Sequence, residues 1–320
     1  MNKFEVEEID CPVCGCANFD LLFKRPDHTH LVSDYQFPVV RCKSCRAGYL
    51  RIRPTREGVK CFYTDDFYRL NSKENAEDKG NRRSYKKLKL FDKYVSAGRL
   101  LDVGCAGGEF VRFLNKRGWD AYGYEPMGGA NLLPDERIKT GSNLLDVYSG
   151  EEFDVVTSWA VLEHVHNLQQ LMDDIATLIR PGGIFISLVT NLNSVPGRFM
   201  RQDDVPRHLN FFTKKSLGIL LKQHNMKPIS WSFKGDIFDG SQRGMLVFGA
   251  KFLLGESMES IVAQHREPGR RHEFCGQLKG RPSKAIASLA AVDRWIAPYF
   301  DTVIESLGYG FIMTVVAQKK

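Results

Sequence analysis

The sequence predicts an α/β protein with a doubly wound, mainly parallel sheet, preceded by a small four-cysteine zinc ribbon. After residue 99, short apolar runs alternate with segments of helical spacing, a pattern typical of a parallel sheet covered by helices on both faces. A glycine-rich turn joins the first apolar run to the first helical segment. Two CxxC pairs lie within the first 45 residues and indicate a metal site.

The composition is that of a soluble globular protein. The chain has 320 residues, of which 43% are hydrophobic and 26% charged, so it is long enough for one core domain and a small appended unit. The N-terminal decapeptide MNKFEVEEID has no apolar run, and no apolar stretch reaches the ~18 residues that span a bilayer. We therefore expect a cytoplasmic protein without a membrane span.

Much of the net charge of +7 comes from two basic segments, residues 82–89 and 198–215. Such segments can attract the phosphates of a nucleotide sugar, a lipid carrier or RNA. The alternative, which we favour, is that both segments form ordinary solvated surfaces.

Four cysteines fall into two pairs, Cys11 and Cys14 in CPVC and Cys42 and Cys45 in CKSC, with 27 residues between the pairs. A two-residue spacer lets two thiolates on one tight turn reach the same ion, and two such turns complete a tetrahedral zinc shell. Four thiolates leave no open position for water, so we expect a structural zinc. Free buried cysteines or a redox motif are the alternatives. Two further cysteines of this segment remain as alternative ligands, Cys16 and Cys61.

We expect three parts along the chain: a zinc ribbon at residues 1–65, a linker and helix at 66–95, and the sheet domain at 96–320. The charged segment NSKENAEDKGNRR (71–83) is predicted to be a mobile linker. The following SYKKLKLFDKYV (84–95) has helical spacing.

An insertion is expected at about residues 252–307, before the last strand. Residues 265–281 are predicted to form a loop and residues 284–307 a helix. The apolar side chains of this helix either line an acceptor pocket or, as we favour, pack on the sheet edge: Ile286, Leu289, Ala290, Val292 and Trp295.

The segment RLLDVGCAGGEF (99–110) carries the strongest functional signal. An apolar run ends at Gly104, and EFVRFLNKRG (109–118) has helical spacing, so the segment predicts a strand, a glycine turn and a helix. Gly104, Ala106 and Gly108 form a G-x-A-x-G pattern, in which small residues let the backbone approach a ligand at the helix N-terminus.

The next predicted strand, WDAYGYE (119–125), ends in Glu125, 23 residues after Asp102. A carboxylate at this place can accept hydrogen bonds from both hydroxyls of a ribose. A nicotinamide dehydrogenase shares the layout but normally needs G-x-G-x-x-G to pass a pyrophosphate over the turn. The compact glycine spacing and the aspartate before the turn suit a ligand without phosphate, such as S-adenosylmethionine.

The rest of the core agrees with this pattern. FDVVTS (153–158) is predicted to be a central strand, residues 168–179 an amphipathic helix, and IFISLV (184–189) a buried strand after the RPGG turn. Ligands of doubly wound sheets bind at the carboxyl ends of the strands, so we expect the site there.

These motifs together resemble a known family. LDVGCAGG, GYEP, FDVVTSWAVLEHV, IRPGG and RHLNFFT are similar to the successive signatures of class I S-adenosylmethionine-dependent methyltransferases, particularly the ubiquinone-type group. The similarity covers about residues 82–250 and, through GFIMTVVAQ (310–318), the C-terminus. The resemblance implies a Rossmann-like, mainly parallel sheet of seven strands.

The N-terminal segment resembles a more specific group. Its CxxC pairs and the pattern RPT..G..CFY.DDFY (53–68) are similar to the N-terminal part of bacterial methyltransferases from saccharide and secondary-metabolite gene clusters. Two positions depart from the family. Ala106 stands where glycine is commoner, and Gly141-Ser142-Asn143 lacks the aspartate that often follows the glycine, which puts the adenine contact in doubt.

The resemblance implies roles for the residues around the turn. Asp102 and Gly104, with Ala106 and Gly107 in the same turn, would hold the amino-acid end of S-adenosylmethionine. The ribose would lie against Glu125. The remaining contacts are implied for the adenine edge, Asn143 and Leu144, and for the cofactor's flank, Trp159, for which plain core packing is the alternative.

Transfer of a methyl group from a sulfonium needs alignment of the acceptor and, for a hydroxyl acceptor, removal of a proton. His164 in LEHV is our first candidate for the base, because it follows the fourth strand and its ordinary pKa lies near neutrality. His208 in RHLNFF is the second candidate. A purely structural role is the alternative for both.

The expected function is therefore methylation of a small-molecule acceptor, a saccharide or related metabolite that can be anionic or sugar-linked, most often at oxygen. An RNA methyltransferase that grips the phosphate backbone with its ribbon is one alternative. A non-catalytic scaffold that retains the fold is the other. The sequence does not identify the acceptor or the oligomeric state.

Overall fold

The computed structural model describes residues 4–27, 32–63, 77–126, 135–194, 204–238 and 284–320. Its centre is a seven-stranded sheet with the order β12-β13-β10-β9-β6-β7-β8. The strands are β6 (Arg99–Val103), β7 (Asp120–Tyr124), β8 (Ile138–Lys139), β9 (Phe153–Trp159), β10 (Ile179–Thr190), β12 (Met226–Ser232) and β13 (Ile312–Lys319).

The sheet is mainly parallel, as predicted. Strands β8, β7, β6, β9 and β10 run parallel to one another, whereas β13 is antiparallel to both β10 and β12. The long β10 pairs with β9 at Ile179 and again from Ile184, with an irregularity between them at the RPGG turn. The C-terminal strand thus lies between β10 and the edge strand β12, and the motif GFIMTVVAQ forms a strand as predicted.

Helices cover both faces of the sheet, which confirms the doubly wound arrangement. Adjacent residues of β6 point to opposite sides: Leu101 belongs to the core beneath α4, α5 and α7, and Leu100 to the core beneath α3. Both side chains are fully buried. The covering helices are α2 (Glu77–Leu88), α3 (Glu109–Asn115), α4 (Leu144–Tyr148), α5 (Leu168–Leu178) and α7 (Lys214–Gln223).

Two helices differ from the prediction. Helix α2 begins at Glu77, inside the segment predicted to be a linker, and ends at Leu88, well before residue 95. Its early start shows that a charged segment can be helical when one face packs against its neighbours, here α3 and the short helix η4 (Asp236–Phe238). The rest of the predicted linker, residues 71–76, lies outside the described residues.

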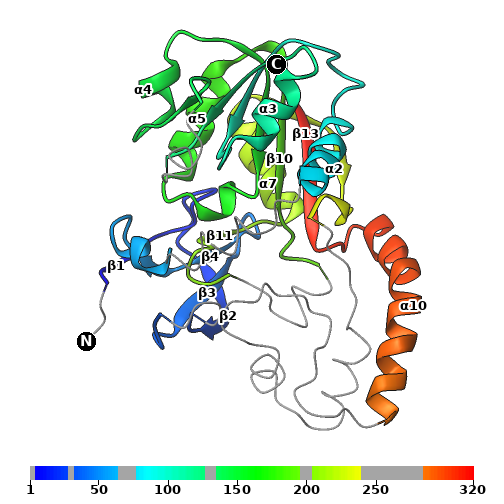
Figure 1. The fold of residues 1–320 in the computed structure, drawn as a ribbon. Coiled ribbons are helices and arrows are strands. Elements are labelled where there is room, and N and C mark those ends of the chain that lie inside the picture. The colour runs from blue at the N-terminus through cyan, green and yellow to red at the C-terminus, as the bar shows by residue number, and fades with distance from the viewer. Residues whose placement is uncertain (1–3, 28–31, 64–76, 127–134, 195–203, 239–283) are drawn as a thin grey trace.

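Helix α10 (Lys284–Ser306) exists as predicted, but the packing expected for it is wrong. Val292 is 46% exposed and Trp295 72% exposed, so neither is held against the sheet edge. Figure 1 shows α10 standing beside the rest of the molecule rather than lying on the sheet. Leu289 is half-buried, whereas the side chains of Ile286 and Ala290 and the predicted loop 265–281 lie outside the described residues.

The N-terminal ribbon contains two small sheets. Strands β1 (Val6–Glu8) and β5 (Ile52–Pro54) pair with each other, and a four-stranded sheet has the order β11-β4-β3-β2. Its strands are β2 (Phe19–Arg25), β3 (Phe37–Cys42), β4 (Gly48–Leu50) and β11 (Asn210–Phe211).

Strand β11 comes from the predicted sheet domain, because it lies more than 150 residues after β4 in the sequence. It pairs antiparallel with β4, Asn210 opposite Tyr49 and Phe211 opposite Gly48. The next residue, Phe212, forms a bridge with Asn191 just beyond β10. The ribbon and the large sheet are therefore joined by main-chain hydrogen bonds.

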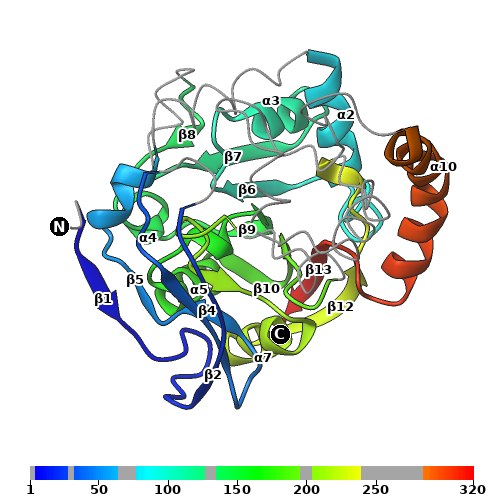
Figure 2. The same ribbon diagram turned by 90° about the horizontal axis from the view of Figure 1, so that it is seen from below.

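The ribbon faces the carboxyl ends of the parallel strands. In Figure 1 the C-terminus lies at the top of the large sheet, so the antiparallel β13 ends there and the carboxyl ends of its parallel neighbours point down toward the ribbon. Figure 2, seen from below, shows the ribbon strands in front of that edge. No helix in the described part of the chain combines the length and apolar character needed to cross a membrane.

Candidate active site and metal centre

The glycine turn after β6 has the backbone that the sequence predicted. Gly104 has φ +73°, and a Cβ there would lie 2.4 Å from Val161 Cγ2. Gly108, the N-cap of α3, has φ +75°, and a Cβ there would lie 2.0 Å from a methyl carbon of Ile138. Both positions require glycine for conformation and for space. The backbone of the turn therefore packs directly against the side chains of Val161 and Ile138, with no room for a Cβ.

Ala106 also adopts the left-handed region, with φ +48°. The Ala106 N–H donates a hydrogen bond to Glu125 Oε2 at 2.9 Å. Glu125 follows β7 and is 9% exposed. The structure thus places the turn and the carboxylate in contact.

Asp102 is buried in β6 beside this turn, and its Oδ1 accepts a hydrogen bond of 2.6 Å from the Thr157 hydroxyl. Burial raises the pKa of Asp102 to about 6, against the opposing effects of Lys87 and Thr157. The nearby carboxylate of Glu125 raises it further. Two carboxylates at the ends of neighbouring strands favour a cationic ligand, because a cation would relieve their repulsion.

Lys87 is a residue of this site that the motif analysis missed. It comes from α2, and its Nζ lies 5.0 Å from the ring centroids of both Phe110 and Trp159. Burial lowers the pKa of Lys87, whereas Asp102 and Glu109 raise it. The basic run at residues 82–89 is the signal that could have found it, but the period of that run did not show which lysine turns inward.

The other residues predicted to contact the cofactor differ in burial and in their hydrogen-bond partners. Trp159 is 7% exposed and meets Phe110 edge-on at 5.8 Å, so it packs in the core and also borders Asp102. Asn143 caps α4, and its amide donates to Asp146. Leu144 is buried under the same helix. Gly107 accepts a hydrogen bond from Arg112 at its main-chain oxygen.

The two candidate bases lie together. His164 ends the short helix η3 (Leu162–His164) after β9, and its ring centroid is 4.7 Å from that of His208, with the rings nearly perpendicular. Burial lowers the pKa of His164, and burial followed by the neighbouring His164 lowers the pKa of His208 to about 3. Both rings are therefore neutral near pH 7, as a general base requires.

A fully buried arginine organises this region, and sequence patterns did not identify it. Arg207 donates to both carboxylate oxygens of Asp204 and, at 3.0 Å, to Asp27 Oδ1 of the ribbon. Burial would raise the pKa of Asp204, but Arg207 outweighs it and holds that pKa well below its usual range. Arg207 stands next to His208 in sequence, yet its partner Asp27 is 180 residues away.

Glu163 is a second buried acid near the candidate bases. Its side chain is fully buried, and Oε1 accepts a hydrogen bond of 2.9 Å from the Thr190 amide. Burial raises the pKa of Glu163 to about 7. The carboxyl thus braces the loop after β9 against the end of β10, which positions the neighbouring His164.

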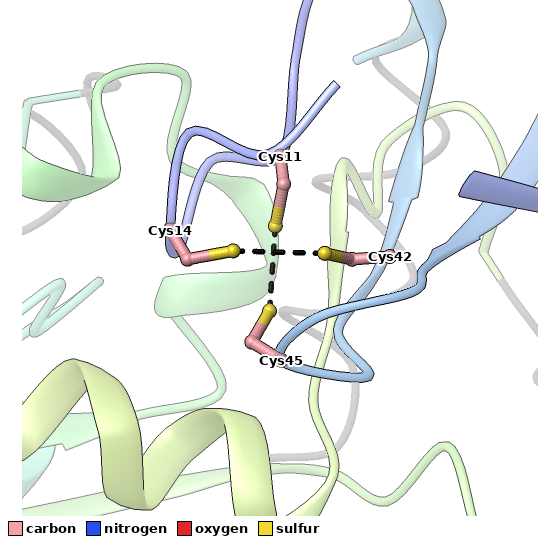
Figure 3. Close-up of side chains that lie close together, drawn as sticks. All are labelled: Cys11, Cys14, Cys42 and Cys45. Atoms are coloured by element: carbon pink, nitrogen blue, oxygen red, sulfur yellow. Dashed lines mark hydrogen bonds between the residues drawn. The ribbon is translucent and has the colours of Figure 1, made fainter. Parts of the chain in front are cut away.

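The four predicted metal ligands meet at one point. The sulfur atoms of Cys11, Cys14, Cys42 and Cys45 all lie within 4.8 Å of one another and converge from two turns (Figure 3). Sγ of Cys11 is 3.4 Å from Sγ of Cys45, and Sγ of Cys14 is 3.6 Å from Sγ of Cys42. A tetrahedral zinc with ~2.3 Å bonds places its sulfurs about 3.8 Å apart, so the four thiolates fit this ion.

The thiol chemistry of this cluster agrees with metal binding. Cys11 and Cys45 share a hydrogen bond that lowers the pKa of Cys45 and, with burial, raises the pKa of Cys11. The two sulfurs thus compete for one proton, and a metal would replace it. The two spare cysteines lie outside the cluster: Cys16 Sγ contacts the Asn18 carbonyl, and Cys61 Sγ the Gly58 carbonyl.

The central part of the chain is similar to known methyltransferases. Residues 74–230 match the model of a family described as a methyltransferase domain. Among curated proteins, the ubiquinone biosynthesis O-methyltransferase of Sinorhizobium medicae is 32% identical over 104 residues, 29% of this chain and 41% of that protein. The corresponding protein of Aeromonas salmonicida is 34% identical over 102 residues, 28% of this chain and 43% of that protein. The match thus spans about two fifths of these relatives' length.

Solved structures of methyltransferases also align. A possible histamine N-methyltransferase from Thermotoga maritima, described as dependent on S-adenosylmethionine, is 15% identical, with a TM-score of 0.45, over 80% of this chain and 99% of that chain. An S-adenosylmethionine-dependent methyltransferase from Archaeoglobus fulgidus is 15% identical, with the same TM-score, over 75% of this chain and 94% of that chain.

Residues 74–230 are thus similar to methyltransferase domains, both by the family model and by the curated relatives that match part of this segment. The four-cysteine cluster precedes that segment in the chain.

Proposed function

We propose that the protein transfers a methyl group from S-adenosylmethionine to a small-molecule acceptor, a saccharide or related metabolite, most often at oxygen. The observation that carries the proposal is the pair of carboxylates, Asp102 and Glu125, on either side of the left-handed turn at the carboxyl ends of β6 and β7. Their negative charge suits a cationic ligand, and a carboxylate at this place can accept the hydroxyls of a ribose.

The residues around the turn would each contact a different part of the cofactor. Glu125 would accept the ribose hydroxyls, and Asp102 would attract the cationic amino-acid end, held over Gly104 and Gly107. Lys87 brings a positive charge toward the same place from α2, where it would bind the carboxylate of the amino-acid end. Leu144 and Asn143 would border the adenine.

When bound, S-adenosylmethionine supplies a methyl group on a positively charged sulfur. The protein's own task is then to orient the acceptor and remove its proton. His164 is the proposed base, because its ring is neutral and lies beside the expected acceptor position after β9. His208, 4.7 Å away, would confine the acceptor and exclude water.

The ribbon favours a small acceptor over RNA. Its residue Tyr63 lies 3.2 Å from His164 Nδ1, and Arg56 donates to the Ser142 carbonyl beside α4. The ribbon therefore borders the site itself, instead of presenting a separate surface to a long polymer. We also propose that Cys11, Cys14, Cys42 and Cys45 hold a structural zinc, and that the ribbon ends near residue 65, before a linker and the domain at 96–320.

The proposal is tested by incubating the zinc-loaded full chain with methyl-labelled S-adenosylmethionine and a host metabolite extract, and identifying the labelled product by mass. We expect label in a hydroxylated small molecule, and none when the variant Glu125→Ala replaces the wild type. Label in RNA instead would overturn the acceptor class. Absence of cofactor binding at millimolar concentration would overturn the enzyme assignment.

A further inference from the structure

The proton on the His164 ring has a defined place. His164 Nδ1 lies 3.0 Å from the main-chain oxygen of Arg207 and 3.2 Å from the hydroxyl oxygen of Tyr63. A carbonyl oxygen has no proton to give, so Nδ1 must be the donor of the first hydrogen bond. Because burial keeps the pKa of His164 low, the ring is neutral and its second nitrogen, Nε2, carries the lone pair.

The Arg207 carbonyl is held by the buried side chain of the same residue. The guanidinium donates to Asp204, to Asp27 and, at 3.0 Å, to the main-chain oxygen of Phe62. We call Asp27, Arg207 and Asp204 the ion cluster. Arg207 and Asp27 have fully buried side chains, and that of Asp204 is 25% exposed.

The ion cluster connects two distant parts of the chain. Asp27 follows β2 of the ribbon, whereas Arg207 and Asp204 lie just before β11. A buried arginine with two carboxylate partners has a defined geometry, since its planar fork fixes both contacts. Removal of one carboxylate would leave the buried charge and hydrogen-bond donors of Arg207 unmatched.

We infer that the ion cluster is a positioning device for His164: it fixes the Arg207 carbonyl, which holds the ring proton on Nδ1 and leaves Nε2 to accept the proton of the acceptor. Asp27 is thereby a positioning residue that the ribbon contributes to the methyltransferase domain. That Nε2 serves as a base rests on the proposed function. The tautomer of His164, by contrast, does not depend on any acceptor.

The tautomer is measured by nitrogen NMR of the zinc-loaded full chain with ¹⁵N-labelled histidine. The His164 signals are assigned by their loss in His164→Gln. We expect a protonated Nδ1 and an unprotonated Nε2. The opposite tautomer in the wild type would overturn the inference directly.

The role of Asp27 is tested with Asp27→Asn, which keeps the shape but removes the charge. We expect the His164 signals to shift toward a mixture of the two tautomers, while zinc content and affinity for S-adenosylhomocysteine stay within about twofold of wild type. The matched control is Asp20→Asn, which removes a ribbon carboxylate that pairs on the surface with Lys43 at 3.2 Å, and it should leave the His164 signals unchanged.

An unchanged Nδ1 tautomer in folded Asp27→Asn would contradict a positioning role for Asp27. If this variant does not fold, Asp204→Asn tests the ion cluster instead, because Arg207 then keeps Asp27 as its one carboxylate partner. An unchanged Nδ1 tautomer in that variant would contradict the positioning role of the cluster. The outcome is separable from the proposed function: full turnover of His164→Ala would refute the base, yet it would leave the measured tautomer as it is.

Discussion

His164 and His208 are distinguished by their surroundings, although they lie side by side. Burial lowers the pKa of both rings, and the neighbouring His164 helps to lower that of His208 to about 3. A base works best when its pKa lies close to the operating pH, so His208 is a poor base near neutral pH. His164 also has its Nδ1 hydrogen-bonded to the Arg207 carbonyl, which leaves Nε2 to take a proton. We therefore favour His164 as the base.

We predict that His164→Ala lowers turnover of the identified acceptor by about 10²-fold or more, the usual contribution of a general base, with cofactor affinity nearly unchanged. In the wild type, kcat/KM should rise with pH through a value below 6.5, the ordinary pKa of histidine, and stay level above it. The control His166→Gln keeps a donor for the Pro54 carbonyl that His166 contacts and should retain turnover. An acid limb near pH 3 would assign the proton to His208 instead.

Asp102 gives a second prediction at this scale. Burial raises its pKa to about 6, so its negative charge is present above pH 6 and is lost as the pH falls through this value. Affinity for S-adenosylmethionine, measured by calorimetry, should therefore decrease by up to about tenfold per pH unit below 6. In Asp102→Asn we expect weaker binding at pH 7.5 and little further loss on acidification. Glu151→Gln, a carboxyl that pairs with Arg99 at the other end of the sheet, should keep the wild-type profile.

At the scale of elements, hydrogen bonds of one side chain fasten the turn of Cys11 and Cys14 to the core. The Gln169 amide of α5 donates to the carbonyl oxygens of Pro12 and Val13, which lie between Cys11 and Cys14. The oxygen of the same amide lies 3.0 Å from Nε2 of His224, the C-cap of α7. One side chain thus joins that turn and two helices.

We predict that Gln169→Ala destabilises the zinc-loaded protein by about 1–3 kcal/mol, because it leaves the hydrogen-bond partners of a half-buried amide unsatisfied. Urea unfolding, followed by circular dichroism, measures the change. Thr177→Ala, an exposed substitution on the same helix, should stay within about 0.5 kcal/mol of wild type. Equal stabilities of the two variants would show that the link contributes nothing.

The elements that the sequence predicted well are those fixed by local rules. The strand, turn and helix from Arg99 to Asn115 follow from an apolar run, a glycine pattern and helical spacing that lie within one short segment. The two CxxC pairs likewise predicted a cluster that the fold brings together. Local spacing also predicted the strands β9, β10 and β13, whereas it did not predict β8 and β12.

Sequence patterns did not predict the contacts between residues that are far apart in the chain. Asp27 and Arg207 meet across 180 residues, and Tyr63 reaches His164 across 101, so no local pattern marks these pairs. The sequence showed Lys87 only as one of several lysines in the basic segment 82–89, and did not indicate that its side chain turns toward Asp102. The start of α2 was missed because its residues are charged and its helical state depends on packing.

The whole molecule places the ribbon over the carboxyl ends of the sheet, so zinc binding and the acceptor side of the site are expected to be coupled. The ribbon is small, and its own apolar core is completed by residues of the sheet domain. Its cysteines belong to the same core cluster as α5 and α7. A metal would supply stability that such a unit lacks.

We predict that Cys42→Ser loses zinc and unfolds the ribbon, and with it acceptor turnover, whereas the sheet domain keeps most of its circular dichroism. Metal content per chain is measured by plasma mass spectrometry. Cys16→Ser, outside the cluster, should retain one equivalent. Retention of a full equivalent by Cys42→Ser would show that the ligand set is wrong.

Glu125, whose carboxylate accepts a hydrogen bond from the turn after β6, is the central residue of the proposed cofactor site. Titration calorimetry of S-adenosylmethionine into wild type and Glu125→Ala at pH 7.5 tests it most directly. We expect one site per wild-type chain and an affinity at least about tenfold weaker in Glu125→Ala, the loss of ~1.4 kcal/mol or more expected for hydrogen bonds to a charged group. Equal affinities, or no binding to the wild type, would contradict the account.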